Sequence, residues 1–189
     1  MAPPPSKERL LEAAYSCVAR SGLAKTTMED VGREAHLSRA TVYRHFPLGK
    51  DQLIREVVAW EAGRFFDRLT RAVAHHTDLA ELLTDALVFA HRAVDDHDVL
   101  QKILETEPDR LLPMLTTQSA RVIALVKQFL ALAMQRATLQ EGIDPDVAAE
   151  HLARMVLSHI SGQGGWDLAD RADARRLADS LLAGIVRQV

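Results

Sequence analysis

The chain has 189 residues, of which 48% are hydrophobic and 26% charged, a balance typical of globular rather than disordered proteins. It contains no apolar run near the roughly 20 residues that cross a bilayer, and its opening Met-Ala-Pro-Pro-Pro-Ser has neither the basic nor the apolar part of a signal peptide, so we expect a cytoplasmic protein. The net charge is −3, but residues 1–55 carry nine Lys or Arg against six Asp or Glu, which leaves +3 there and −6 in the remainder. A basic N-terminal segment favours contact with phosphate groups at one end of the protein.

Stretches rich in Ala, Leu, Arg and Glu, with few alternating β-branched residues, predict an all-α fold. The first helix is expected over residues 6–21, with Gly22 as its stop. Cys17, the single cysteine, lies on the apolar stripe of this helix, so we expect it to be buried. Redox sensing is the alternative, and it would need an accessible thiol with basic neighbours.

Residues 27–46 predict two short helices joined by a tight turn. Thr26 or Thr27 can cap the first, in which Met28, Val31 and Ala35 recur at helical spacing. That helix ends near His36, and Ser38 can cap the second by accepting a bond from a free backbone N–H.

In the second helix, Val42 and Phe46 form an i, i+4 apolar pair that we expect to face inward. The side chains left to face outward are polar or basic for the most part: Arg39, Thr41, Tyr43, Arg44 and His45.

After residue 50 the spacing of apolar residues predicts a helical bundle. Helices are expected over residues 50–75, 78–95, 97–105, about 108 or 117 to 140, 145–161 and 173–188. We therefore predict two domains, an N-terminal three-helix helix-turn-helix domain over residues 1–49 and a helical-bundle domain over residues 50–189.

Residues 6–58 resemble the N-terminal domain of the TetR family of bacterial transcriptional regulators. The family signature runs threonine, apolar helix, Ala-Gly-apolar-Ser, Thr-apolar-Tyr-x-His/Tyr-Phe, and Lys-acidic-x-Leu. The matching residues are Ala35, Ser38, Thr41, Tyr43, Phe46, Lys50, Asp51 and Leu53. His36 departs from the usual glycine, and the spacer 47–49 is one residue longer than the commonest one. We expect the turn to be retained with some strain, because a positive φ costs histidine more than glycine.

The resemblance implies a sequence-specific DNA-binding transcriptional regulator, in most cases a ligand-responsive repressor that acts as a homodimer on a palindromic operator. By their chemistry, Arg39 and Arg44 can bond guanine O6 and N7 together, and Thr41 can meet a base edge. The family resemblance places Thr27, Tyr43, His45 and Lys50 on the DNA backbone, although the Tyr43 ring could instead pack against the core. The predicted DNA-binding residues are Thr27, Ser38, Arg39, Ala40, Thr41, Tyr43, Arg44, His45 and Lys50.

The last two predicted helices each carry a broad apolar face, which indicates a dimer interface. In the family the equivalent pair forms a four-helix interface with its twofold mate. The predicted interface residues are Leu152, Met155, Val156, His159, Leu177, Leu181, Gly184 and Ile185. The alternative is that these faces form a core within one chain.

The resemblance also implies an effector pocket within residues 50–142, whose occupancy moves the helix that begins at Lys50. We expect a small, largely apolar effector. The candidate pocket residues, each of which can equally be ordinary core or surface, are Trp60, Phe65, Phe89, His91, Gln101, Leu104, Met114, Leu115, Gln118, Arg121 and Phe129.

No enzyme motif of the Gly-x-Ser-x-Gly, His-Glu-x-x-His or Walker type is present, and residues 162–165 indicate a loop. The eight histidines show no spacing typical of a ligand set, so we expect no metal, no cofactor and no catalysis. Two alternatives remain open. One is a helical ligand-binding or adaptor protein that has lost specific DNA binding, which only His36 supports, and the other is an enzyme with an unrecognised helical site.

Overall fold

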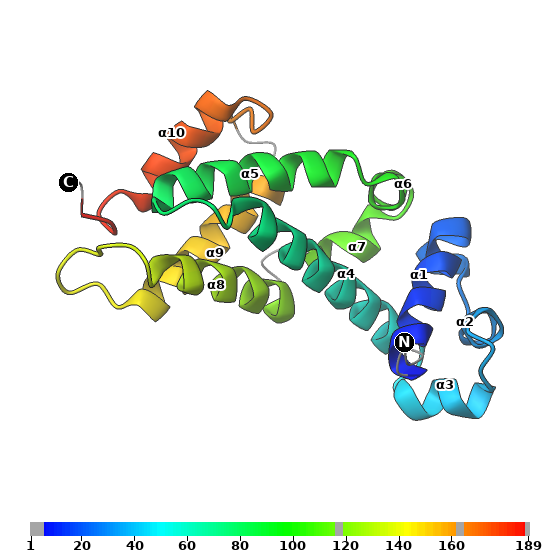
Figure 1. Cartoon of the computed structure of the whole chain (residues 1–189). Helices are drawn as coiled ribbons and strands as arrows, with labels where there is room; N and C mark the ends of the chain where they lie inside the picture. The colour runs from blue at the N-terminus through cyan, green and yellow to red at the C-terminus, as the bar shows by residue number, and fades with distance from the viewer. Residues whose placement is uncertain (1–5, 116–118, 162–164, 188–189) are drawn as a thin grey trace. The chain divides into compact units, whose positions relative to one another are not determined.

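In the computed structural model the described residues are 6–115, 119–161 and 165–187, and all their longer elements are helices (Figure 1). The all-α prediction is therefore confirmed. None of the helices in this part of the chain is both long and apolar enough to span a membrane. The helices are α1 (Ser6–Lys25), α2 (Met28–Glu34), α3 (Arg39–His45), α4 (Lys50–Val73), α5 (Leu79–Asp95), α6 (Asp98–Thr106), α7 (Pro108–Leu115), α8 (Ala120–Met134), α9 (Pro145–Ser161) and α10 (Arg171–Leu182).

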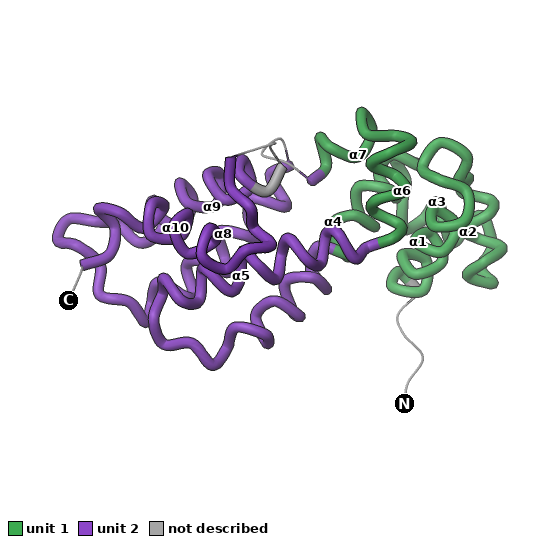
Figure 2. The backbone as a smooth tube through the Cα atoms, turned by 90° about the horizontal axis from the view of Figure 1, so that it is seen from above, with its two compact units in different colours: residues 1–61, 98–114 green, residues 62–97, 115–189 purple. Residues whose placement is uncertain are grey.

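The chain divides into two compact units that alternate along the sequence (Figure 2). Unit 1 contains residues 1–61 and 98–114, and unit 2 contains residues 62–97 and 115–189. The first half of α4, together with α6 and α7, thus belongs to the same unit as α1–α3. The two domains that we predict from the sequence, 1–49 and 50–189, divide the chain at the start of α4 instead.

The core of unit 1 is built where the apolar stripes of α1, α2, α3 and α4 meet. Leu10, Val31 and Leu53 are completely buried in it. Cys17 is 3% exposed, and its burial raises the pKa of the thiol above the ordinary value. The expected burial of this cysteine is confirmed, and a thiol with a raised pKa is unsuited to redox sensing.

Hydrogen bonds between α1 and the segment where α6 meets α7 extend unit 1 beyond its three N-terminal helices. Gly22 has a φ of 81°, a non-helical conformation that interrupts the helix where the sequence predicts its stop, and α1 resumes beyond this kink to Lys25. A Cβ at Gly22 would lie 2.5 Å from Oε1 of Glu107, so a larger residue would have to move that carboxylate in addition to adopting a positive φ. The other carboxylate oxygen of Glu107 accepts a hydrogen bond from the N–H of Ala24 at 2.7 Å, and Lys102 donates to the carbonyl of Ala19 at 3.1 Å.

Unit 2 is a bundle in which α8 packs on α9 and α10 packs on α5. Its apolar core includes Leu87, Leu130 and Leu152, each 2% exposed or less. At the rim of the α5–α10 contact, Arg171 on α10 donates from Nε to Oδ1 of Asp85 on α5 at 2.9 Å.

Two helices in unit 2 end earlier than the sequence pattern predicts. α8 ends at residue 134 rather than 140, and α10 ends at residue 182 rather than 188, so both predicted ends are wrong. The reason is a pairing between distant segments. The N–H of Arg187 donates to the carbonyl of Thr138 at 3.0 Å and that of Gln140 to the carbonyl of Ile185 at 2.9 Å, and these bonds replace further helical turns.

The turn after α2 closes the helix with two backbone hydrogen bonds. The N–H of Leu37 donates to the carbonyl of Gly32 at 2.9 Å, and that of His36 donates to Arg33 at 3.1 Å. This is the Schellman pattern, in which the residue after the C-cap adopts a left-handed conformation and is usually glycine. His36 occupies that position with a φ of 53°, so the expected turn and its positive φ are confirmed.

Replacing His36 by glycine should therefore stabilise the protein. We predict that His36→Gly raises the free energy of unfolding by about 0.5–1 kcal/mol, because a left-handed backbone costs an L residue about 1–2 kcal/mol and the flexibility of glycine in the unfolded chain offsets part of that gain. Urea unfolding measures the change. Arg33→Gly, at a helical position three residues earlier, is the control and should lose about 1 kcal/mol. A loss of stability in His36→Gly would show that the imidazole itself supports the turn.

Candidate nucleic-acid interface

α2 and α3 are positioned by caps at their N-termini. Thr27 accepts a hydrogen bond from the N–H of Asp30 at 3.1 Å, and the Asp30 carboxylate accepts one from the N–H of Thr27 at 3.3 Å, which completes a capping box. At α3, Oγ of Ser38 accepts from the N–H of Thr41 at 3.2 Å. The predicted caps are confirmed, with Thr27 and not Thr26 capping α2.

The crossing of α2 and α3 is close because Gly32 has no side chain. A Cβ there would lie 3.2 Å from both the carbonyl oxygen of Leu37 and a methyl of Val42. Val42 and Phe46 are both 0% exposed and pack in the core of unit 1, so the predicted inward pair is confirmed. These contacts fix which side of α3 faces the solvent.

The solvent side of α3 presents a polar and basic surface, which we call the α3 face. Arg39, Ala40, Tyr43 and Arg44 are exposed, whereas Thr41 and His45 are half-buried. The Arg39 guanidinium lies 5.3 Å from the centre of the Tyr43 ring and 3.1 Å from a carboxylate oxygen of Glu29. The Tyr43 ring is thus on the surface beneath a cation rather than in the core. An exposed helix with two arginine forks can contact base edges in a DNA major groove.

Two predicted contacts with the DNA backbone already have partners within unit 1. Nζ of Lys50, in the first turn of α4, donates to the carbonyl of Ala24 at 2.7 Å. The hydroxyl of Thr27 donates to Asp30 at 2.7 Å. Both side chains are partly or fully exposed, but a phosphate contact would have to replace or share these bonds.

The predicted pocket residues are distributed between the two units. Trp60, Gln101, Leu104 and Met114 belong to unit 1 and the others to unit 2. Arg121 is exposed, Leu115 is half-buried, and His91 lies 3.2 Å from Asp95 on its own helix. Gln118 is outside the described residues.

Three of the pocket candidates come together around a phenylalanine that we did not select from the sequence. Phe66 lies 5.1 Å from Phe65 and 6.1 Å from Phe129 between ring centres, and Phe65 lies 5.9 Å from Phe89. These four partly buried rings, which we call the phenylalanine cluster, come from α4, α5 and α8. Phe66 follows Phe65 directly and stands three and seven residues before the buried Leu69 and Val73, so its helical spacing could have identified it.

Half of the eight predicted dimer residues are buried in the core of their own unit. Leu152, Val156, Leu177 and Leu181 are all at most 9% exposed within the chain. Met155 is 38% exposed, Gly184 is exposed, and His159 and Ile185 are half-buried. The apolar faces of α9 and α10 therefore serve largely as intramolecular core. The exposed apolar side chains of this region are instead Leu132, Val147 and Met155.

Comparison with known proteins places both parts of the chain in one family. The model of bacterial regulatory proteins of the tetR family matches residues 10–57, and that of the bacterial tetracyclin repressor C-terminal domain matches residues 78–179. An HTH-type transcriptional regulator of Mycobacterium bovis is 27% identical over 168 residues, which cover 88% of this chain and 82% of the relative.

Solved structures share the fold over the whole chain. The TetR family repressor AlkX from Dietzia sp. superposes with a TM-score of 0.73 at 20% identity and covers 99% of this chain and 100% of its own. SmeT, the repressor of a Stenotrophomonas maltophilia multidrug efflux pump, was solved with triclosan. Its complex superposes with a TM-score of 0.57 at 26% identity, and the match covers 97% of this chain and 92% of the SmeT chain. The chain belongs to the TetR family of bacterial regulatory proteins and is a DNA-binding transcriptional regulator.

Proposed function

We propose that this regulator is a ligand-responsive repressor that binds a palindromic operator as a homodimer in the bacterial cytoplasm, and we assign it no catalytic step. The α3 face is the observation that supports this proposal most. Burial of Val42 and Phe46 fixes the rotation of α3, so its exposed arginines face the solvent in the DNA-free protein. Repression is supported by the names of the similar structures, AlkX and SmeT.

The predicted DNA-binding residues, on the α3 face and beside it, divide into two roles by chemistry. Arg39, Thr41 and Arg44 read base edges, because a planar guanidinium can bond guanine at two atoms and a threonine can meet a thymine methyl or a base edge. Thr27, Ser38, Tyr43, His45 and Lys50 contact the DNA backbone, and Ala40 allows α3 to approach the groove closely. On binding DNA, the guanidinium of Arg39 leaves the carboxylate of Glu29 and contacts a base. The ammonium group of Lys50 leaves the carbonyl of Ala24 and contacts a phosphate.

For the dimer we propose an interface on the exposed side of α9. Val147 and Met155 are 66% and 38% exposed and lie two helical turns apart on one side of α9, with His151 exposed between them. Leu132 on α8, which packs against α9, is 54% exposed. A twofold axis beside α9 would cover these apolar side chains with the same side chains of a second copy. His159 and Ile185 are half-buried and can contribute to the rim.

For the effector we propose a site at the phenylalanine cluster in unit 2. Partly buried aromatic rings favour a largely apolar ligand, and SmeT, at 26% identity, binds the chlorinated aromatic compound triclosan. α4 carries Phe65 and Phe66 in this cluster and Lys50 in its first turn, so one continuous helix reaches both proposed sites.

If Arg39 and Arg44 read base edges, their replacement should change which operator sequences the protein prefers. Arg39→Ala and Arg44→Ala should each lose about 1–3 kcal/mol at one operator position, whereas Lys50→Ala should weaken all sequences alike and reduce the salt dependence by about one phosphate contact. Competition binding with single-base operator variants makes the measurement. Arg92→Ala, an exposed arginine on α5 in unit 2, is the control and should bind normally. If both α3 variants rank the operator variants as the wild type does, neither arginine reads bases.

The proposed dimer predicts a contrast between an exposed and a buried residue. Met155→Asp should give folded monomers, because a carboxylate would be desolvated at the interface without a partner. Leu181→Asp should unfold unit 2, since Leu181 is 9% exposed in the core. Light scattering and circular dichroism report the two effects. Leu112→Asp, on an apolar residue of similar exposure (40%) in unit 1, is the control and should remain dimeric. A Met155→Asp protein that stays dimeric would place the interface elsewhere.

The proposed effector site predicts reciprocal coupling. A bound effector should lower operator affinity about 5–150-fold, and operator DNA should lower effector affinity by the same factor. Triclosan is the first probe, followed by other apolar aromatic compounds, with binding measured by thermal shift and operator affinity by fluorescence anisotropy. Phe66→Ala should weaken effector binding. Trp166→Ala is the control and should leave effector binding unchanged, because Trp166 is an aromatic residue of unit 2 outside the phenylalanine cluster, with its ring beside the guanidinium of Arg176. Compounds that stabilise the protein without changing operator affinity would exclude induction at this site.

A further inference from the structure

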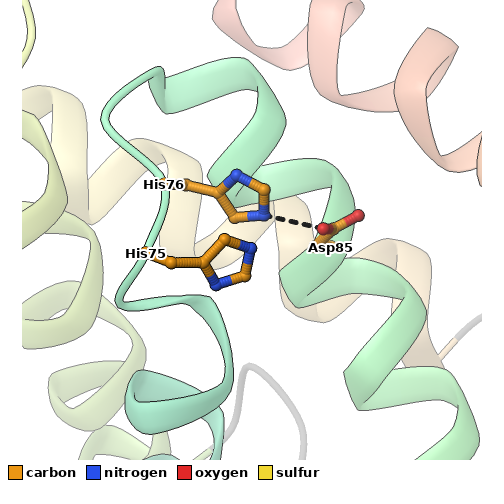
Figure 3. A group of neighbouring side chains, drawn as sticks. All are labelled: His75, His76 and Asp85. Carbon is orange, nitrogen blue, oxygen red and sulfur yellow. Dashed lines mark hydrogen bonds and ion pairs between the residues drawn. The ribbon is translucent and has the colours of Figure 1, made fainter.

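Three potential metal ligands meet in unit 2 at the turn between α4 and α5. His75 and His76 follow the end of α4, and Asp85 lies in the second turn of α5 (Figure 3). One ligand atom from each residue lies within 4.8 Å of the other two. The imidazole rings are 3.9 Å apart between centres, and Figure 3 shows a nitrogen of each on the side nearest Asp85. Among the described residues this is the group of three such side chains that can hold one ion.

The carboxylate of Asp85 is oriented by two neighbours from different elements. Nε2 of His76 lies 2.7 Å from Oδ2 of Asp85, and Nε of Arg171 donates to Oδ1 at 2.9 Å. Burial alone would raise the pKa of Asp85, but the hydrogen bonds from His76 and Arg171 outweigh it and the pKa is lowered. Arg171, which also pairs with Glu81, occupies only Oδ1 of Asp85, and Oδ2 is the oxygen that lies against His76.

Two imidazoles and one carboxylate form a ligand set that suits zinc with an open fourth position. Bond lengths of about 2.0–2.2 Å place tetrahedral ligands roughly 3.3 Å apart, so the hydrogen-bonded atoms of His76 and Asp85 would separate by about half an ångström. The side chain of His75 is exposed in the turn and can rotate toward the ion, whereas His76 and Asp85 are half-buried and already face each other.

We propose that His75, His76 and Asp85 bind one divalent transition-metal ion, with zinc as the best fit and water completing the coordination. The ion takes the place of the hydrogen bond between Nε2 of His76 and Oδ2 of Asp85, and a hydrogen on Nε2 moves to Nδ1 through solvent, so that two ring nitrogens and Oδ2 become its ligands. Arg171 keeps its bond to Oδ1 and supports the carboxylate from outside, as outer partners of metal ligands commonly do. Bound there, the ion joins the turn after α4 to α5, and through Arg171 to α10.

The experiment is a titration of the tag-free, metal-free protein with zinc chloride by isothermal calorimetry, followed by thermal unfolding with and without zinc. His75→Ala is the principal variant, because an exposed turn residue can be removed without disturbing the core. His76→Gln tests the second ligand. His91→Ala is the matched control, since His91 also lies 3.2 Å from an aspartate but belongs to no three-ligand group among the described residues.

The wild type should bind one zinc ion per chain and unfold at a higher temperature with zinc present. His75→Ala and His76→Gln should bind at least about tenfold more weakly, and His91→Ala should match the wild type. The proposal fails if the wild type shows no saturable binding, because Asp85 then serves only its ion pairs with His76 and Arg171. It also fails if His75→Ala, with a metal-free unfolding temperature like that of the wild type, binds zinc with unchanged affinity.

Discussion

The burial of Val42 and Phe46 is the interaction on which the DNA-binding surface depends. α3 has seven residues, and a helix of two turns is not stable alone in water. Both side chains are fully buried, and Gly32 on α2 leaves room for α3 to approach closely. Because the core fixes the rotation of α3, it also fixes the direction in which Arg39 and Arg44 point. A loss of this packing would therefore remove the DNA-binding surface without any change to the side chains that form it.

Unit 1 is larger than the helix-turn-helix, and this affects how a signal can reach DNA. Glu107 accepts a hydrogen bond from the backbone of Ala24 and fills the space beside Gly22, while Lys50 donates to the carbonyl of Ala24. The end of α1 is thus held by the first residue of α4 on one side and by the α6–α7 junction on the other. In the proposed switch, a movement of α4 or α6 would be transmitted to the second half of α1 through the hydrogen bonds at Ala24 and Ala19.

Local features of the fold were predictable from sequence, whereas features that depend on distant residues were not. The caps at Thr27 and Ser38 and the positive φ of His36 involve neighbours within five positions, and each is confirmed. The contact of Gly22 with Glu107 and the group formed by His75, His76 and Asp85 depend on how helices pack. Periodicity finds the apolar stripes of α9 and α10 but cannot tell which chain covers them, and half of the residues predicted for the dimer interface lie in the core of unit 2.

The proposed function requires that the α3 face recognises a specific DNA sequence as part of a symmetric dimer. Selection of binding sites from random double-stranded DNA by the purified wild-type protein tests this requirement. We expect an enriched inverted repeat, because two α3 helices related by a twofold axis read the same bases on opposite strands. A folded protein that enriches no sequence, or that binds all DNA with equal affinity, would exclude this mode of recognition.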